Sequence, residues 1–258
     1  MIPKKIHYCW FGRNELPPLA KKCIKSWEKY CKGYEIIRWD ESNFDVESSP
    51  LYVKQAYEAK KWAFVTDYVR LCAMTKYGGI YMDTDVEVLR PLDCFLEHKA
   101  FSGFESESSI PTGIMACEKD FSLFCEFLKY YDDVSLYDSN GNLQYITNVT
   151  IMTNICVKKG LKQNNTFQII DGFVLYPKDY FCPVSHRTGK LKKTKNTYTI
   201  HWFAGSWLDE KTKAQFKEKR KKNRKQDRRD KLKHLPNTIL KTIVGDKRYN
   251  KLKSYKKR

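Results

Sequence analysis

The sequence lacks the features that would place the chain in a membrane or in an oxidising compartment. No run of about 18 apolar residues occurs in it, so no membrane-spanning helix is expected. The opening residues, M-I-P-K-K-I, have no apolar core of the kind found in secretory signal peptides. The nine cysteines are scattered without a C-x-x-C pair, which predicts reduced thiols and disfavours a disulfide framework or a zinc site. We therefore expect a cytoplasmic protein.

Excess acidic charge is also missing, and the positive charge is concentrated at one end of the chain. The formal net charge is +18, of which residues 211–258 carry +17, from 21 Lys and Arg against 4 acidic residues. Such a tail is either a solvated surface or disordered end, or an element attracted to a polyanion such as an anionic membrane or a nucleic acid. The sequence predicts a nearly neutral body over residues 1–209 and a basic helical tail over residues 210–258.

The body shows strand and helix patterns in alternation. The whole chain has 258 residues, 41% of them hydrophobic, which suffices for one full-sized domain with a sizeable core. A strand, a helix and a second strand open the chain, which predicts a βαβ unit and a parallel sheet. The expected strands cover residues 5–10, 34–39, 80–82, 86–89, 167–170 and 198–202. The expected helices cover residues 19–30, 60–76, 121–131, 150–159 and 210–232, and a short amphipathic segment covers 239–244.

Two aspartates follow directly after the apolar strand of residues 80–82. Asp83 and Asp85 are two positions apart, and in an extended segment such side chains point to the same side. Two carboxylates at a strand end suit a divalent cation such as Mn²⁺ or Mg²⁺, which in turn binds phosphate oxygens. The triplet alone is common by chance, so its meaning depends on the surrounding sequence.

That surrounding sequence carries a longer pattern. It reads T-D-Y-V-R at residues 66–70 and, after a helix, Y-G-G-I-Y-M-D-T-D at residues 77–85. This resembles the DXD-motif glycosyltransferase sugar-binding family, which includes bacterial capsular-polysaccharide sugar transferases and fungal initiating mannosyltransferases. More distantly it is similar to the glucosyltransferase domains of large clostridial toxins. The segment P-K-K-I-H-Y-C-W-F-G at residues 3–12 and H-W-F-A-G-S-W at residues 201–207 resemble the opening and closing motifs of the same family.

The resemblance covers roughly residues 2–207 and implies an α/β fold of the GT-A type, with a Rossmann-like nucleotide-binding sheet. It also implies a metal at the D-x-D and retention of the anomeric configuration of the transferred sugar. Asp85 would ligate the metal directly, and Asp83 would lie near the metal, the ribose and the donor sugar. His201 would approach the metal or the phosphate, unless it is a core residue at a strand end.

The remaining site residues implied by the resemblance bind the nucleotide sugar. Asp67 and Arg70 would hold the donor sugar and its diphosphate, although Asp67 could merely pair with Arg70 at i,i+3 on one helix face. Trp10 would flank the base of the nucleotide, and the alternative is that it packs in the core. Tyr81 is also expected to bind the nucleotide sugar. The residues that would close over the β-phosphate are Ser206 and Trp207. His7 is expected to be a structural histidine.

The predicted function is transfer of a sugar from a nucleotide-sugar donor to a saccharide acceptor. UDP is the expected carrier, with GDP as the alternative, and the acceptor is expected to be lipid-linked, in surface polysaccharide biosynthesis. The basic tail would hold the enzyme at the inner face of the membrane. A catalytic base is not identified by sequence, and Glu105, Glu107 and Asp171 are candidates by residue type only. The rival functions are nucleic-acid binding through the tail, which we do not expect, and metal-dependent phosphohydrolysis.

Overall fold

The computed structural model describes residues 1–110, 113–144, 146–206, 208 and 210–233. The chain divides into two units, one of Met1–His186 with Lys190–Trp207 and one of Arg187–Gly189 with Leu208–Arg258. Each unit is considered by itself. The functional division at residue 209 stays a prediction.

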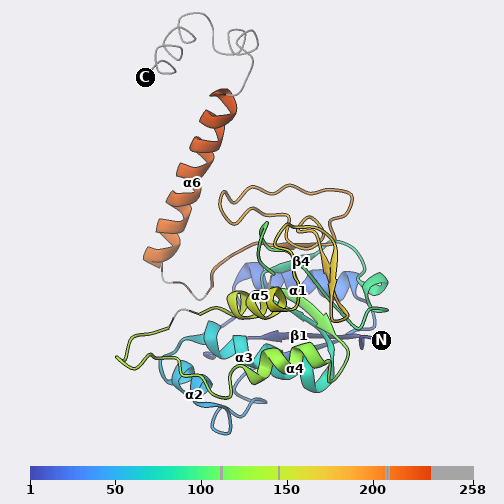
Figure 1. Ribbon diagram of the computed structural model, residues 1–258, viewed down its shortest axis with the longest axis vertical. Coiled ribbons are helices and arrows are strands. Elements are labelled where there is room, and N and C mark those ends of the chain that lie inside the picture. Colours follow the sequence, from blue (N-terminus) through green and yellow to red (C-terminus); the bar gives the residue numbers. More distant parts are fainter. Residues whose placement is uncertain (111–112, 145, 207, 209, 234–258) are drawn as a thin grey trace, which may run out of the picture. The chain divides into compact units, whose positions relative to one another are not determined.

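A seven-stranded mixed sheet with the order β2-β1-β3-β6-β5-β8-β7 forms the centre of the first unit (Figure 1). Neighbours β1/β2, β1/β3 and β5/β8 are parallel, and β3/β6, β5/β6 and β7/β8 are antiparallel. The strands are β1 Lys5–Cys9, β2 Glu35–Trp39, β3 Gly79–Met82, β5 Ala100–Gly103, β6 Ile114–Cys117, β7 Gln168–Ile170 and β8 Phe173–Tyr176. The predicted α/β class and the parallel βαβ start are confirmed.

Helices cover both faces of this sheet, because alternate strand residues are apolar on each side. Ile80 and Met82 of β3 belong to one buried cluster, together with Trp27, whereas Tyr81 belongs to the other, together with Val65. In Figure 1, α1 therefore lies on one side of β1 and both α3 and α4 lie on the other. The helices of this unit are α1 Pro18–Tyr30, α2 Leu51–Glu58, α3 Trp62–Tyr77, α4 Ser122–Lys129 and α5 Asn148–Lys158, with a 3₁₀ turn at Asp93–Phe95.

The chain reverses where β3 ends, and this turn carries the two aspartates. The peptide nitrogen of Val86 donates to the carbonyl oxygen of Asp83 over 3.0 Å, which closes a tight turn. The expectation of an extended segment at residues 83–85 is therefore wrong, and it is this turn that presents the two carboxylates. After it, β4 Val86–Val88 leaves the main sheet and pairs antiparallel with β9 Thr199–His201.

The second unit is dominated by one long polar helix, α6 Glu210–Lys233. Within this unit the Asn223 amide donates to the carbonyl oxygen of Arg187 over 2.8 Å, and Arg187 also pairs with Asp227. The predicted exposed helix is confirmed, whereas the predicted amphipathic segment at residues 239–244 lies outside the described residues. Among the helices that the structure describes, none combines the length and apolar character that crossing a bilayer requires.

Candidate active site

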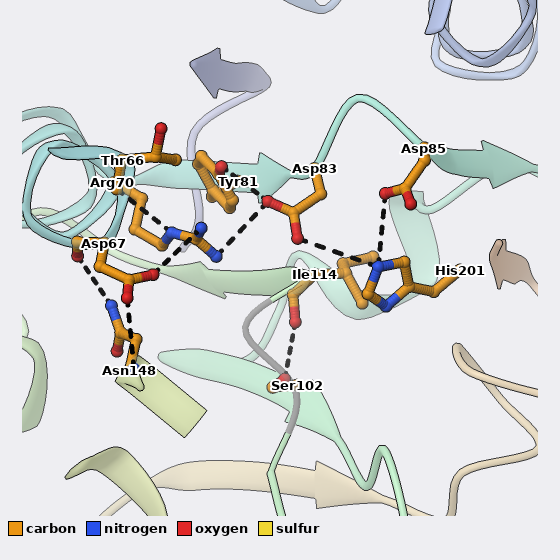
Figure 2. A network of polar contacts seen from close by, with 10 residues as sticks. All are labelled: Thr66, Asp67, Arg70, Tyr81, Asp83, Asp85, Ser102, Ile114, Asn148 and His201. Atoms are coloured by element: carbon orange, nitrogen blue, oxygen red, sulfur yellow. Dashed lines mark hydrogen bonds and ion pairs between the residues drawn. The ribbon is translucent and has the colours of Figure 1, made fainter. Parts of the chain in front are cut away.

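Asp83 is held from one side by residues of α3 and β3 (Figure 2). Its Oδ1 accepts a hydrogen bond from the Tyr81 hydroxyl over 2.8 Å and lies 3.4 Å from Nη1 of Arg70. The Arg70 guanidinium also lies 4.7 Å from the centre of the Tyr81 ring, a cation–π distance. These contacts fix the carboxylate so that its second oxygen, Oδ2, faces His201.

Asp85 and His201 meet because β4 pairs with β9. The register places Val86 opposite His201, and Nε2 of His201 lies 3.3 Å from Oδ1 of Asp85 and 4.0 Å from Oδ2 of Asp83. The other oxygen of Asp85 accepts a hydrogen bond from the peptide nitrogen of Ala204 over 2.7 Å. Each carboxylate thus has one oxygen engaged by the protein and one oxygen directed at the imidazole.

These three side chains fit a divalent cation. One ligand atom from each of Asp83, Asp85 and His201 lies within 4.8 Å of the others, so a single ion can contact all three. Two carboxylates and one imidazole form a donor set that suits Mn²⁺, and carboxylate oxygens also suit Mg²⁺. The alternative that His201 is merely a core residue does not account for its position between two carboxylates.

A glycine that the sequence interpretation missed leaves room for this arrangement. A Cβ atom on Gly113 would lie 2.7 Å from Nδ1 of His201, so any side chain there would displace the imidazole. The carbonyl oxygen of Gly113 accepts from the peptide nitrogen of Asp83 over 2.8 Å. The close approach of β6 to β9 is a tertiary effect, and residues 109–116 carry no motif that signals it.

Asp85 and His201 each favour the ionised form of the other. Burial opposes ionisation of Asp85, but the adjacent His201 imidazole lowers the pKa of this carboxyl below its usual value. Burial likewise opposes protonation of His201, yet Asp85 raises the pKa of the imidazole well above its usual value. In the absence of a cation the two groups form an ion pair, which a bound cation would replace.

Asp67 and Arg70 extend the network away from the protein atoms that would bind the metal. Arg70, only 5% exposed, lies with Nη2 3.3 Å from Oδ1 of Asp67, so the i,i+3 pairing left open by the sequence does form. The same guanidinium reaches Asp83, which means that the pair is also part of the site. Burial raises the pKa of Asp67 to about 6, although Arg70 opposes the shift.

Asn148, at the start of α5, supports Asp67 and was not found from sequence. Its side-chain nitrogen donates to the carbonyl oxygen of Asp67 over 2.7 Å, and its peptide nitrogen lies 3.4 Å from Oδ2 of the same residue. The Thr147 hydroxyl caps the helix by accepting from the peptide nitrogen of Thr150. Residues 145–150 lack a family motif, so only the fold reveals that this helix end meets α3.

Two residues predicted to bind the nucleotide, Trp10 and Ser206, lie close in sequence to elements of the site. Trp10 follows β1, is partly buried against the cluster around Trp27, and donates from Nε1 to the carbonyl oxygen of Asn14 over 2.7 Å. Ser206 is exposed two residues after Ala204, which is bonded to Asp85. Trp207 lies outside the described residues. The nucleotide-binding roles of these residues stay predictions.

His7 is structural, as expected. Its Nδ1 accepts from the Trp39 indole over 3.1 Å, so its Nε2 carries the proton and donates to the carbonyl oxygen of Gly78 over 2.8 Å. The ring is fully buried, and burial lowers its pKa.

The three candidates for a catalytic base lie at different places in the fold. Glu105 follows β5, and burial raises the pKa of its carboxyl. The charge of His201 opposes this shift, and the charges of Asp83 and Asp85 add to it. Glu107 is exposed on the following loop. Asp171 precedes β8 at the opposite end of the strands, and it pairs with Lys159 over 3.1 Å. Glu105 alone of the three is near the cluster.

The fold and this site define an α/β protein with a carboxylate–imidazole cluster that fits a divalent cation, beside a buried arginine. Residues 17–102 match the family described as glycosyltransferase sugar-binding region containing DXD motif. Residues 17–102 thus contain the DXD-motif region that defines this glycosyltransferase family, as the motifs suggested.

Several individual proteins are similar to this chain. The chain is 31% identical to inositol phosphoceramide mannosyltransferase 3 of Schizosaccharomyces pombe over 150 residues, 57% of this chain and 41% of that protein. It is 26% identical to an uncharacterized glycosyltransferase, L373, of Acanthamoeba polyphaga mimivirus, over 80% of this chain and 84% of that protein. Among solved structures, the PaToxG glycosyltransferase aligns with a TM-score of 0.47 and 16% identity, covering 62% of this chain and 69% of that chain. The matched part is thus less than half of the yeast relative.

Proposed function

We propose that this protein is a metal-dependent retaining glycosyltransferase that moves a sugar from a nucleotide-sugar donor to a saccharide acceptor. The observation that carries the proposal is the convergence of Asp83 Oδ2, Asp85 Oδ1 and His201 Nε2, with the remaining carboxylate oxygens held by protein groups. UDP is the proposed carrier, with GDP as the alternative. A phosphohydrolase would use such a cation site too, but it would not require the buried Asp67 and Arg70 beside it.

In this proposal, Asp83, Asp85 and His201 hold Mn²⁺ or Mg²⁺. When bound, the ion offsets the negative charge that builds on the leaving diphosphate. Arg70, fixed between two carboxylates, presents its remaining N–H groups to the diphosphate or to hydroxyls of the donor sugar. Asp67 accepts from those hydroxyls, and Asn148 keeps its backbone in place.

The reaction breaks the bond between the anomeric carbon and the β-phosphate oxygen, which keeps the electron pair. A new bond forms from the acceptor hydroxyl oxygen to the same carbon, and the hydroxyl proton passes to the departing phosphate. No dedicated base is needed in that case. The charges of the cluster act on the Glu105 carboxyl, and we assign this residue no proton-transfer step.

The transferred group is proposed to be a hexose or an N-acetylhexosamine, and the acceptor to be lipid-linked. The name of the fission-yeast relative, a mannosyltransferase acting on inositol phosphoceramide, supports a hexose and a lipid-borne acceptor. For this chain we propose a role in surface, such as capsular, polysaccharide biosynthesis.

A panel of nucleotide sugars tests the proposed function. With Mn²⁺ present, one donor should be bound and slowly hydrolysed, and EDTA should abolish the hydrolysis because the diphosphate then lacks its counter-charge. Release of phosphate from a simple monoester, with no nucleotide sugar turned over, would instead support the phosphohydrolase.

We also propose that the tail holds the enzyme at the cytoplasmic inner face of an anionic membrane. Over residues 210–233, 13 Lys and Arg oppose 4 acidic residues, and the charges of α6 surround the helix without an apolar stripe. Such a helix adsorbs to phosphate headgroups through its charge and does not insert.

This association predicts a salt-dependent result in vesicle co-sedimentation. The full chain should sediment with phosphatidylglycerol vesicles and far less with phosphatidylcholine vesicles. Its sedimentation with phosphatidylglycerol vesicles should fall at about 0.5 M salt, where screening is strong. A 1–210 truncation should remain in the supernatant. Equal sedimentation of the two proteins on anionic vesicles would contradict the proposal, and salt-dependent gel shifts of DNA or RNA would favour nucleic-acid binding.

A further inference from the structure

A pocket of about 200 Å³ opens between α2, the start of α5 and the loop that follows α4. Its polar and aromatic walls come from Tyr52, Tyr130, Asp133, Ser135 and Gln144. Aromatic faces together with a carboxylate, an amide and a hydroxyl are groups that recognise a sugar ring, through its C–H face and its hydroxyls respectively. None of these residues takes part in the cation site.

The loop wall of this pocket is built by specific hydrogen bonds. The side-chain oxygen of Gln55, on α2, accepts from the Ser135 hydroxyl over 2.9 Å and from the peptide nitrogen of Leu136 over 2.8 Å. The peptide nitrogen of Gln144 donates to the carbonyl oxygen of Leu136 over 2.9 Å, which brings the two ends of the loop together. The position of the wall is therefore fixed by α2.

Tyr52 connects the pocket to the Asp67 network. Its ring lies 4.9 Å from that of Tyr131, and both hydroxyl oxygens are buried without a hydrogen-bond partner among the described residues. Burial raises the pKa of both hydroxyls, and the charge of Asp67 adds to the shift of each. Buried hydroxyls are normally paired, so these two mark a place where a polar ligand or water is accommodated.

Helix α5 makes the same connection from the other side. Its first residue, Asn148, bonds to Asp67, and Ile151, one turn later, lines the pocket. Asp67 in turn lies against Arg70, which reaches Asp83. Asp67 and Arg70, the two residues proposed to hold the donor sugar, thus link the pocket to the cation-binding atoms.

We propose that this pocket binds the sugar ring of the acceptor. The inference rests on the proposed function, because it places the second substrate next to the donor sugar, on the side away from the diphosphate. Asp133 and Gln144 then bind acceptor hydroxyls at the rim, and the rings of Tyr52 and Tyr130 contact its C–H face.

Saturation-transfer NMR with methyl glycosides of mannose, glucose, galactose and N-acetylglucosamine tests this proposal, with diamagnetic Mg²⁺ as the cation. At least one glycoside should bind the full chain, and Asp133→Asn and Gln144→Ala should each weaken its binding about tenfold, through loss of one or two hydrogen bonds. Asp132→Asn is the matched control, because Asp132 is the adjacent exposed aspartate and does not line the pocket.

Hydrolysis of the nucleotide sugar without acceptor distinguishes this proposal from the proposed function. All three variants should hydrolyse the donor within about twofold of the wild-type rate. The acceptor assignment would be overturned if no glycoside bound to the wild type, if the pocket variants bound as the Asp132 control does, or if they weakened donor binding instead. Absence of donor hydrolysis in the wild type would count against the proposed function itself.

Discussion

Arg70→Lys should lower donor turnover on the order of 100-fold while leaving the chain folded. A lysine keeps the positive charge, but its single ammonium cannot take up the forked geometry by which Arg70 reaches both Asp67 and Asp83. Loss of one preorganised electrostatic contact to a leaving group typically costs about 10²–10³ in rate. Arg70→Ala should additionally destabilise the fold by about 3–5 kcal/mol, because the buried carboxylate of Asp67 and the partly buried one of Asp83 would lose their partner.

Arg90→Lys is the control for this substitution. Arg90 also lies over an aromatic ring, 4.0 Å from the centre of Tyr198, and donates to the carbonyl oxygen of Lys195 over 2.8 Å, but it has no carboxylate partner among the described residues. Steady-state donor hydrolysis and thermal unfolding should be measured for both variants. Near-wild-type turnover by Arg70→Lys, or an equal loss in both variants, would contradict the role given to Arg70.

The sequence predicted the first half of the sheet better than the second. β1, α1 and β2 show alternating and helical periods of clear length, and α3 ends at Gly78, whose positive φ of 63° suits a helix end. Strands β5, β6 and β8 were missed because each has four residues that are buried or nearly so on both faces, which leaves no alternation to detect. The eight-residue helix α2 was missed as well.

The sequence predicted those residues of the site that belong to short motifs. Asp83, Asp85 and His201 were named from the resemblance, and the structure brings them together. Asn148 was not found, because its contact with Asp67 spans 81 positions and depends on how α5 packs. The geometry of the aspartates was also misjudged, since a turn and not an extended strand directs them.

Asp85→Asn should reduce donor turnover about 10²–10³-fold, the larger of the effects expected from a single conservative change. The amide preserves the size of the side chain and can still accept from Ala204, but it removes the negative charge that faces His201. Neutral amide oxygens bind divalent cations more weakly than carboxylates, so excess Mn²⁺ should restore part of the activity. Asp93→Asn, at a partly exposed carboxylate paired with Lys4, should leave turnover unchanged.

Mn²⁺ binding followed by electron paramagnetic resonance, in the presence of the donor nucleotide, tests the central claim most directly. The wild type should bind one ion per chain, and Asp85→Asn should bind it at least tenfold more weakly, while Asp93→Asn should match the wild type. Wild-type Mn²⁺ affinity in Asp85→Asn would contradict the assignment of the cation site to Asp83, Asp85 and His201.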